Sequence, residues 1–339
     1  MIVEIDGSMG EGGGQILRTA VALSCALHTD VVIKNIRKGR KTPGLRAQHL
    51  AGIRLATEMC DADVDGVEIG STEVHFSPRS NTGGSFEIDI GTAGSISLVL
   101  QTCMLPAFLA NGPTELIIRG GTDVPWSPPI DYLTLVLLPL MQKMGATAEI
   151  TTEQRGFYPS GGGVVSAHVL PSGGLRGIDI EDRGKLLKIR GSIASRNLPP
   201  HVPDRIGAAA VKTLSRYVLP DIETDISRGP STGASFVLSA EYENTFIGAS
   251  CLGEKGVPAE RVGELAATHL DEEMRSGATL DQHAADQLIP FMFLAEGGSA
   301  FRTADLSAHA KTNLRVSAQM MDRDSEVSQE NGTTQVRIV

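Results

Sequence analysis

The sequence predicts an α/β (α+β) fold in which one structural unit is used more than once. Residues 4–25 form a short alternating stretch, a glycine-rich turn and an Ala-rich segment, which is the pattern of a strand, a turn and a helix. The pattern recurs at an offset of about 83 residues. Glu87-Ile88-Asp89 repeats Glu4-Ile5-Asp6, and Gln101-Thr102 stands at the place of Arg18-Thr19.

A fainter third copy begins near Asp286, and about a hundred residues interrupt it. Its segment 290–297 echoes segment 106–112. Between residues 184 and 277, the order strand, helix, three strands, helix predicts a small domain with its own core. We therefore expect a large three-unit domain over residues 1–183 and 278–339, with an inserted α/β domain over residues 184–277.

Turn and capping signals delimit the individual elements. Thr42-Pro43-Gly44 ends a polar loop before a helix over 45–60, and Asn111-Gly112-Pro113 stops the second-copy helix near residue 110. Pro128 and Pro129 suit the start of a helix that runs to about residue 144. A last helix is predicted over 307–321, followed by a polar tail that ends in a strand over 334–339. The other predicted strands are 64–69, 73–77, 86–90, 114–119, 147–152, 186–191, 222–226, 235–241, 245–252 and 299–303, and the other helices are 202–217, 259–274 and one that opens at 283.

Charge and cysteine content narrow the class of protein. A net charge of -10 argues against broad electrostatic binding of duplex nucleic acid. One stretch differs, because residues 34–46 carry six Lys or Arg and no acid, which favours contact with a few phosphates, although a solvated basic loop gives the same pattern. The longest apolar stretch, 98–110, is too short to span a membrane. The cysteines are scattered and make no CxxC pair, which favours a reducing cytoplasm.

The glycines at positions 7, 10, 12, 13 and 14 precede a helix and could bring backbone N–H groups close to a phosphate. The stretch is not a Walker A loop, since no Gly-Lys-Ser/Thr follows. A second glycine cluster lies in Arg155-Gly-Phe-Tyr-Pro-Ser-Gly-Gly-Gly-Val-Val165. A plain turn in the first case and a bulged hairpin in the second are the structural alternatives.

Three stretches together resemble the RNA 3′-terminal phosphate cyclase family. The segment from Arg155 to Val165 looks like the signature of that family, and Gly10-Glu-Gly-Gly-Gly-Gln-Ile-Leu-Arg18 resembles its N-terminal loop. His283-Ala-Ala-Asp-Gln287 and His309-Ala-Lys-Thr-Asn313 are similar to its nucleotide and nucleophile region. The resemblance implies three units of a four-stranded sheet with two helices, plus a smaller inserted domain with thioredoxin-like connectivity.

The resemblance also implies an ATP-dependent conversion of an RNA 3′-phosphate to a 2′,3′-cyclic phosphate. A histidine takes AMP from ATP, an RNA(3′)pp(5′)A intermediate forms, and the neighbouring 2′-hydroxyl closes the ring. His309 matches the family nucleophile, and Glu11 matches the glutamate that holds a divalent ion, Mg²⁺ or Mn²⁺. The implied nucleotide- and phosphate-binding residues are Arg18, Arg40, Gln48, Gln101, Pro129, Tyr132, His283, Ala284, Ala285, Asp286 and Gln287. The implied partners are ATP and RNA with a 3′-phosphate end.

Two other classes of protein remain open at this point. Eukaryotic relatives with this fold assist ribosomal RNA processing without a nucleophile, and carboxyvinyl transferases share the repeated unit. An intact His309 and an intact 283–287 segment argue against the first class. The second class uses longer chains with more copies. Only the cyclase should retain a covalent adenylate after incubation with labelled ATP.

Overall fold

The computed structural model describes residues 2–330 and 332–339, and within that part of the chain the strands form four four-stranded sheets. Each sheet contains one parallel pair and two antiparallel pairs. The predicted α/β class is therefore confirmed.

The first two sheets take their strands from consecutive parts of the chain. In both, the spatial order is first, second, fourth, third strand along the sequence. The first sheet contains, in spatial order, β1 (Ile2–Asp6), β2 (Asp30–Lys34), β4 (Val74–Ser77) and β3 (Asp63–Asp65). The second contains β5 (Gly84–Asp89), β6 (Thr114–Gly120), β8 (Gly163–Leu170) and β7 (Thr147–Gln154).

The third sheet has the same spatial order, although its strands are far apart in the chain. It contains β9 (Asp179–Ile180), β14 (Ser299–Thr303), β16 (Thr333–Ile338) and β15 (Ser325–Glu330). The fourth sheet lies between β9 and β14 in sequence and has a different order, with its first two strands parallel. It contains β11 (Asp221–Ser227), β10 (Leu186–Arg196), β12 (Gly233–Tyr242) and β13 (Phe246–Leu252).

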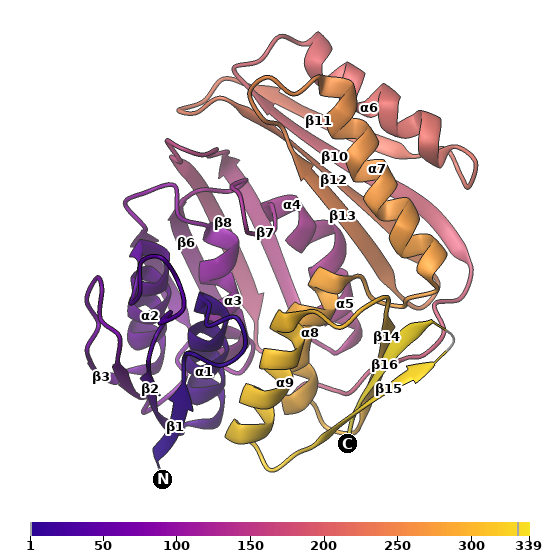
Figure 1. Ribbon diagram of the computed structural model, residues 1–339. Helices are drawn as coiled ribbons and strands as arrows, with labels where there is room; N and C mark the ends of the chain where they lie inside the picture. The colour runs from indigo at the N-terminus through magenta and orange to yellow at the C-terminus, as the bar shows by residue number, and fades with distance from the viewer. Residues whose placement is uncertain (1, 331) are drawn as a thin grey trace.

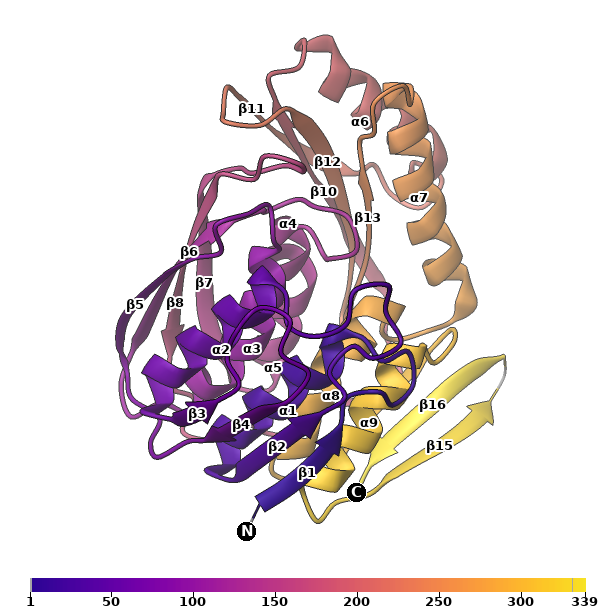
Figure 2. The ribbon, with the colours of Figure 1, turned by 60° about the vertical axis from the view of Figure 1, so that its left-hand side comes forward.

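Helices fill the space between the first three sheets (Figures 1 and 2). They contact one another there, and their apolar faces belong to one large core. The helices are α1 (Gly14–Leu27), α2 (Ala47–Cys60), α3 (Ile96–Phe108), α8 (Gln282–Leu294) and α9 (Ala308–Met320), together with the continuous run of α4 (Ile130–Tyr132), the π-helical turn η1 (Leu133–Leu137) and α5 (Leu138–Lys143). The fourth sheet carries α6 (His201–Leu214) and α7 (Ala259–Ser276) on one face and has a separate core.

The other face of the fourth sheet packs on the α4–η1 run. Gly248 of β13 allows this approach, because a Cβ at that position would lie 2.6 Å from both Tyr132 and Val136. Pro139 lacks the N–H that would bond the carbonyl of Leu135 four residues earlier. The hydroxyl of Ser239 on β12 donates to that carbonyl instead, at 3.0 Å. The carbonyl that the helix leaves unpaired is thus satisfied by a side chain of the fourth sheet, which links that sheet to the π-helical turn.

A buried ionic cluster joins the same two surfaces. Arg155 donates to Asp131 at 2.6 Å and to Asp123 at 3.4 Å. From the fourth sheet, Ser192 donates to Asp131 and Ser235 donates to Asp123, each at 2.7 Å. Burial raises the pKa of Asp123, and the guanidinium opposes that shift. Burial alone would lower the pKa of Arg155, but the two carboxylates raise it above its usual value. Arg155, the first residue of the glycine-rich 155–165 segment, is therefore a structural cation.

Most predicted helices begin and end within a few residues of their observed bounds, and the strand predicted over 334–339 is confirmed as β16, whereas the strand before it in the tail was missed. The polar residues after Asp322 form a hairpin, in which β15 pairs with β16. The strand β15 escaped prediction because it is largely exposed and has no alternation of apolar and polar residues. The two-residue strand β9 was also missed. Within the described residues, no helix is both long and apolar enough to cross a membrane.

We expect Arg155→Met to lower the free energy of unfolding by about 3–5 kcal/mol, because it leaves two carboxylates buried without their cation. The matched control is Arg205→Met, which removes an exposed ion pair with Glu260 and should cost at most about 1 kcal/mol. Urea denaturation of both variants measures the difference. Equal losses of unfolding free energy in the two variants would show that the buried cluster contributes no more to stability than an exposed ion pair.

Candidate active site

His309 lies in the first turn of α9, beside the glycine-rich loop that follows β1. Ser307 caps this helix by accepting from the N–H of Ala310 at 2.8 Å. Gly10 in the loop has φ +55°, and a Cβ there would lie 2.6 Å from the hydroxyl of Thr312, so a glycine lets the loop lie against α9. The predicted helix start at Ser307 is confirmed, and His309, two residues later, lines a cavity and is partly exposed to solvent.

Two carboxylates flank the imidazole of His309, which is 43% exposed. Glu11 Oε2 lies 3.4 Å from Nε2, and Asp286 Oδ2 lies 3.8 Å from Nδ1. Glu11 also pairs with Arg40 at 3.3 Å. Asp286 accepts a hydrogen bond from the Ser307 hydroxyl. Burial raises the pKa of Asp286, while Ser307 and His309 oppose the shift. The two ring nitrogens therefore face different surroundings, one exposed and one against a largely buried acid.

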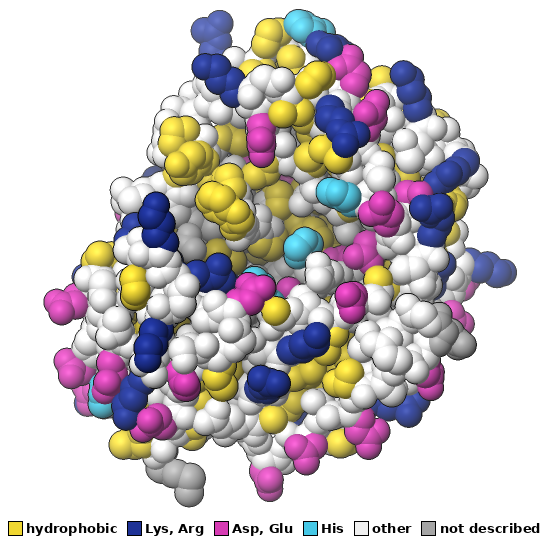
Figure 3. All heavy atoms as spheres, in the orientation of Figure 1, with side chains coloured by type: hydrophobic (Ala, Val, Ile, Leu, Met, Phe, Trp, Pro, Cys, Tyr) yellow, Lys and Arg dark blue, Asp and Glu magenta, His cyan; other side chains and the backbone are white. Residues whose placement is uncertain are grey.

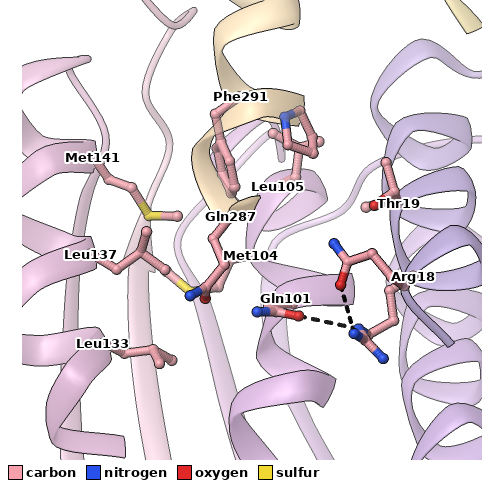
Figure 4. Close-up of a pocket in the computed structure, with 13 residues that line it drawn as sticks. Arg18, Thr19, Gln101, Met104, Leu105, Leu133, Leu137, Met141, Gln287 and Phe291 are labelled. Carbon is pink, nitrogen blue, oxygen red and sulfur yellow. Dashed lines mark hydrogen bonds between the residues drawn. The ribbon is translucent and has the colours of Figure 1, made fainter. Parts of the chain in front are cut away.

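Arg18 extends from α1 toward α3, and Figure 4 shows its guanidinium pointing at Gln101. Its Nε donates to Gln101 Oε1 at 3.1 Å and its Nη2 to Gln15 Oε1 at 2.7 Å. Burial lowers the pKa of Arg18 to about 10, so the group remains charged at neutral pH. Among the described residues, no carboxylate lies within ion-pair distance of it. A desolvated cation without a counter-ion favours an anionic ligand.

The N-terminus of α8 is organised by Asp281, which is almost fully buried. Its Oδ1 accepts from the N–H groups of His283 and Ala284 and from the Tyr132 hydroxyl, the last at 2.6 Å. Its Oδ2 accepts from the N–H of Gly248 at 2.8 Å. One carboxylate thus fixes α8, α4 and β13 relative to one another. Burial and Asp281 raise the pKa of Tyr132. Because the Tyr132 hydroxyl donates to Asp281, only its ring is available to a ligand.

These elements enclose a cavity of about 400 Å³, which is within the usual range for small-molecule sites. Figure 3 shows the hollow at the centre of this face, with hydrophobic side chains along one edge and histidine and charged side chains along another. The lining combines residues from α1, α3, α4, α8, α9, the 126–129 loop and β13. It therefore draws on distant parts of the chain, including the fourth sheet.

The structure brings most of the predicted site residues together, but not all of them. The predicted residues that line the cavity are Arg18, Gln101, Pro129, Tyr132, His283, Asp286, Gln287 and His309. Glu11 lies next to it through its contact with His309, and Arg40 reaches it only indirectly, through its ion pair with Glu11. Gln48 lies outside the lining, and its Oε1 accepts from the N–H of Ser95. Ala284 and Ala285 are buried in the large core and do not face the cavity.

The match to known proteins covers nearly the whole chain. The model of the RNA 3′-terminal phosphate cyclase family matches residues 9–327. The chain belongs to this family. It is 45% identical to the RNA 3′-terminal phosphate cyclase of Archaeoglobus fulgidus over 316 residues, which covers 93% of this chain and 94% of the relative. It is 43% identical to that of Methanopyrus kandleri, over 99% of both chains. Its identity to that of Methanosarcina barkeri is 45%, over 99% of this chain and all of the relative.

Sequence reasoning missed several residues that shape this family member's cavity. Asp281 stands directly before the helix that was predicted to open at 283, and an acid at that position is a helix-capping signal that could have identified it. Ser250, Cys251 and Leu252 line the cavity from β13. No local signal places them there, because the docking of the fourth sheet depends on long-range contacts. His49 was also missed. Its Nδ1 accepts from the N–H of Arg46, and a Cβ on Gly14 would lie 2.1 Å from its Nε2.

We expect Asp281→Ala to lower the free energy of unfolding by about 2–4 kcal/mol, since it removes a helix cap and leaves the buried Tyr132 hydroxyl unpaired. Asp281→Asn should cost less, because the amide oxygen keeps the bonds to α8 while its NH₂ opposes the N–H of Gly248. Ser95→Ala, which removes the cap of α3 alone, is the control and should cost about 1 kcal/mol. Denaturant melts measure all three. Equal costs for the two alanine variants would argue against a joining role for Asp281.

His49 should make the protein sensitive to mild acid. Burial, followed by the charges of Arg18, Arg37 and Arg46, lowers the pKa of His49 from 6.5 to about 3. Between these values the unfolded chain binds a proton that the folded chain excludes, so stability falls as the pH drops from about 6.5 toward 3. We expect His49→Asn, whose side-chain oxygen replaces Nδ1 as acceptor, to lose less stability than the parent between pH 7 and pH 5. Melting temperatures at the two pH values test this, and parallel losses in both proteins would contradict it.

Proposed function

We propose that the protein converts the 3′-phosphate end of RNA to a 2′,3′-cyclic phosphate and that His309 carries AMP between the two substrates. The observation that carries this proposal is the position of His309. It lines a nucleotide-sized cavity, is partly exposed and lies between two carboxylates, and the same cavity holds a charged arginine that has no carboxylate within ion-pair distance among the described residues. The family's name, RNA 3′-terminal phosphate cyclase, indicates which reaction these residues would carry out.

In the first step, His309 attacks the α-phosphorus of ATP. We assign the attack to Nε2, because the buried Asp286 lies on the Nδ1 side and can hold the proton there. An N–P bond forms and the bond from phosphorus to pyrophosphate breaks. The imidazole becomes positively charged, and Asp286 stabilises that charge. A neutral imidazole needs no prior loss of a proton from an alcohol, which makes it a suitable carrier for a phosphoryl group.

The cavity supplies complementary contacts for an adenine nucleotide. Pro129 and the ring of Tyr132 form an apolar wall, and His283 stands edge-on to Tyr132 with 6.1 Å between ring centroids. Gln287 is buried, and its Oε1 has no hydrogen-bond partner within the described residues. An orphaned acceptor of this kind suits an amino or hydroxyl group of the nucleotide. Arg18 provides the cation for a phosphate, with Gln101 orienting it. Ala284 and Ala285 contribute through the helix that carries these residues.

A divalent ion fits the site through Glu11. The described residues contain no cluster of three or more metal-binding side chains. Mg²⁺ bound to a nucleotide commonly takes only one or two carboxylates from the protein and completes its shell with phosphate oxygens and water. The exposed carboxylate of Glu11, beside His309, can supply such a ligand. The ion would neutralise phosphate charge when bound.

The later steps use the RNA. An oxygen of its 3′-phosphate attacks the phosphorus of the histidine-bound AMP, the N–P bond breaks, and RNA(3′)pp(5′)A forms. The adjacent 2′-hydroxyl then attacks the RNA phosphorus, loses its proton and expels AMP. Arg40 would guide the RNA phosphate, because it reaches the site through Glu11 from the acid-free 34–46 segment. Gln48 would add its side-chain NH₂, since its oxygen is already engaged.

We also infer the arrangement of units. The shared strand order of three sheets supports three copies of one unit, each with two helices. The fourth sheet, whose strand order and parallel first pair match a thioredoxin-like connection, would be the domain inserted over residues 184–277. Its separate core supports this division. The scattered cysteines remain the support for a cytoplasmic location.

We expect His309→Asn to abolish AMP attachment while leaving the melting temperature nearly unchanged, because the side chain is partly exposed and its carboxylate neighbours lie 3.4 and 3.8 Å from its ring nitrogens. Intact mass after incubation with ATP and Mg²⁺ should show one adenylyl group on the parent and none on the variant. His168→Asn, an exposed histidine on β8 outside the cavity, is the matched control and should still accept AMP. Adenylation of the His309→Asn protein would overturn the assignment.

The same assay separates the rival functions. A protein that only assists ribosomal RNA processing, or a carboxyvinyl transferase, would retain no adenylyl group from labelled ATP. A cyclase should also release its AMP when it is given an oligoribonucleotide with a 3′-phosphate, and the oligonucleotide should then carry a cyclic end. An oligonucleotide with a 3′-hydroxyl is the substrate control.

A further inference from the structure

Trp126 is the only tryptophan in a chain with 4% aromatic residues, and its side chain is 95% exposed. An indole has a large apolar ring and a polar N–H, so burial of this ring against a ligand would be favourable. The residue also has φ +63°. Bulky residues rarely adopt this left-handed conformation, and it persists only where the surrounding structure holds the backbone in it.

The backbone on both sides of Trp126 is held in place. Before it, Thr122 donates through its N–H to the carbonyl of Gly156 at 2.8 Å, and Asp123 belongs to the buried ionic cluster. After it, Ser97 donates to the carbonyl of Pro128 at 2.6 Å. The loop also closes on itself, since the hydroxyl of Ser127 donates to the carbonyl of Val124 at 3.0 Å. The indole is therefore displayed outward by a fixed loop.

Trp126 lines the same cavity as His309 and stands at its outer edge. The inner walls are different in kind, because Tyr132 is 1% exposed and Gln287 is 7% exposed. A nucleotide held by those walls has its base inside. The RNA must approach from outside, since its terminal phosphate has to reach the adenylate on His309. Its terminal nucleoside would then lie across the mouth of the cavity, where the indole is.

We propose that Trp126 stacks on the base of the 3′-terminal nucleotide of the RNA. The proposal rests on the proposed cyclase function and adds a substrate contact to it. An aromatic face binds the π surface that all bases share, so the contact adds affinity without selecting a sequence. The basic 34–46 segment, which reaches His309 through Arg40 and Glu11, would hold phosphates of the same RNA.

The test is a double-mutant cycle between protein and RNA. The protein arms are the parent, Trp126→Ala and Trp126→Phe, with Leu219→Ala as a control at an exposed position outside the cavity. The RNA arms are two 3′-phosphorylated oligoribonucleotides that differ only in whether the terminal nucleotide carries a base. Fluorescence anisotropy of a label at the 5′ end gives the dissociation constants.

For the RNA with a terminal base, we expect Trp126→Ala to bind roughly 5- to 100-fold more weakly and Trp126→Phe to keep most of the affinity. For the RNA without that base, the parent and Trp126→Ala should bind equally. A loss of equal size on both RNAs, or no loss on either, would overturn the stacking contact.

Intrinsic fluorescence provides a second test, because all tryptophan emission comes from this one residue. The 3′-phosphorylated oligonucleotide should quench it, and a non-hydrolysable ATP analogue alone should leave it nearly unchanged. Strong quenching by the analogue would instead place the indole against adenine. AMP attachment to the parent protein with ATP alone tests the proposed cyclase function separately. If AMP attaches to the parent protein but Trp126→Ala shows no base-dependent loss of RNA affinity, only the role of Trp126 is rejected.

Discussion

The buried carboxylate of Asp281 is the interaction on which the geometry of the cavity depends. It joins the start of α8, the hydroxyl of Tyr132 and the backbone of β13 at Gly248. Each of these elements supplies one wall, and none of them is near another in sequence. A carboxylate suits this place because it accepts several hydrogen bonds at once, and the bonds offset the cost of burying it. Through it, the fourth sheet becomes part of the site.

The distribution of charge around His309 follows from burial. Asp286 is largely buried and Glu11 is exposed, so the two acids beside the same imidazole have different roles open to them. Arg18 retains its charge in a poorly solvated position, and its partners are amide oxygens, which orient the guanidinium without neutralising it. The buried ionic cluster around Arg155 has the opposite character, because two carboxylates compensate that cation. Arg18 is therefore available to bind an anion, whereas Arg155 stabilises the fold through its two buried ion pairs.

The sequence predicted well what depends on neighbouring residues. The start of the helix that carries His309 was predicted at the right place, because a helix start depends on neighbouring residues, and Ser307 proves to be its cap. The α/β class and most elements of the fourth sheet followed from periodicity. The wall formed by Ser250, Cys251 and Leu252 was not predictable, since it depends on how Gly248 fits against Tyr132 and Val136. The edge strand β15 was missed because its exposed polar residues carry no pattern, and its order comes from backbone pairing with β16.

The cavity is lined by α1 near the beginning of the chain and by α8 and α9 near its end. Between these, α3, the 126–129 loop, α4 and β13 of the fourth sheet supply the rest of the lining. A ligand held there touches all of these parts at the same time. Ligand binding therefore raises the free energy of unfolding of the whole chain. The increase grows with the logarithm of the ratio of ligand concentration to dissociation constant. For a protein of several sheets, an occupied site thus acts as a non-covalent crosslink that couples the unfolding of the separate cores.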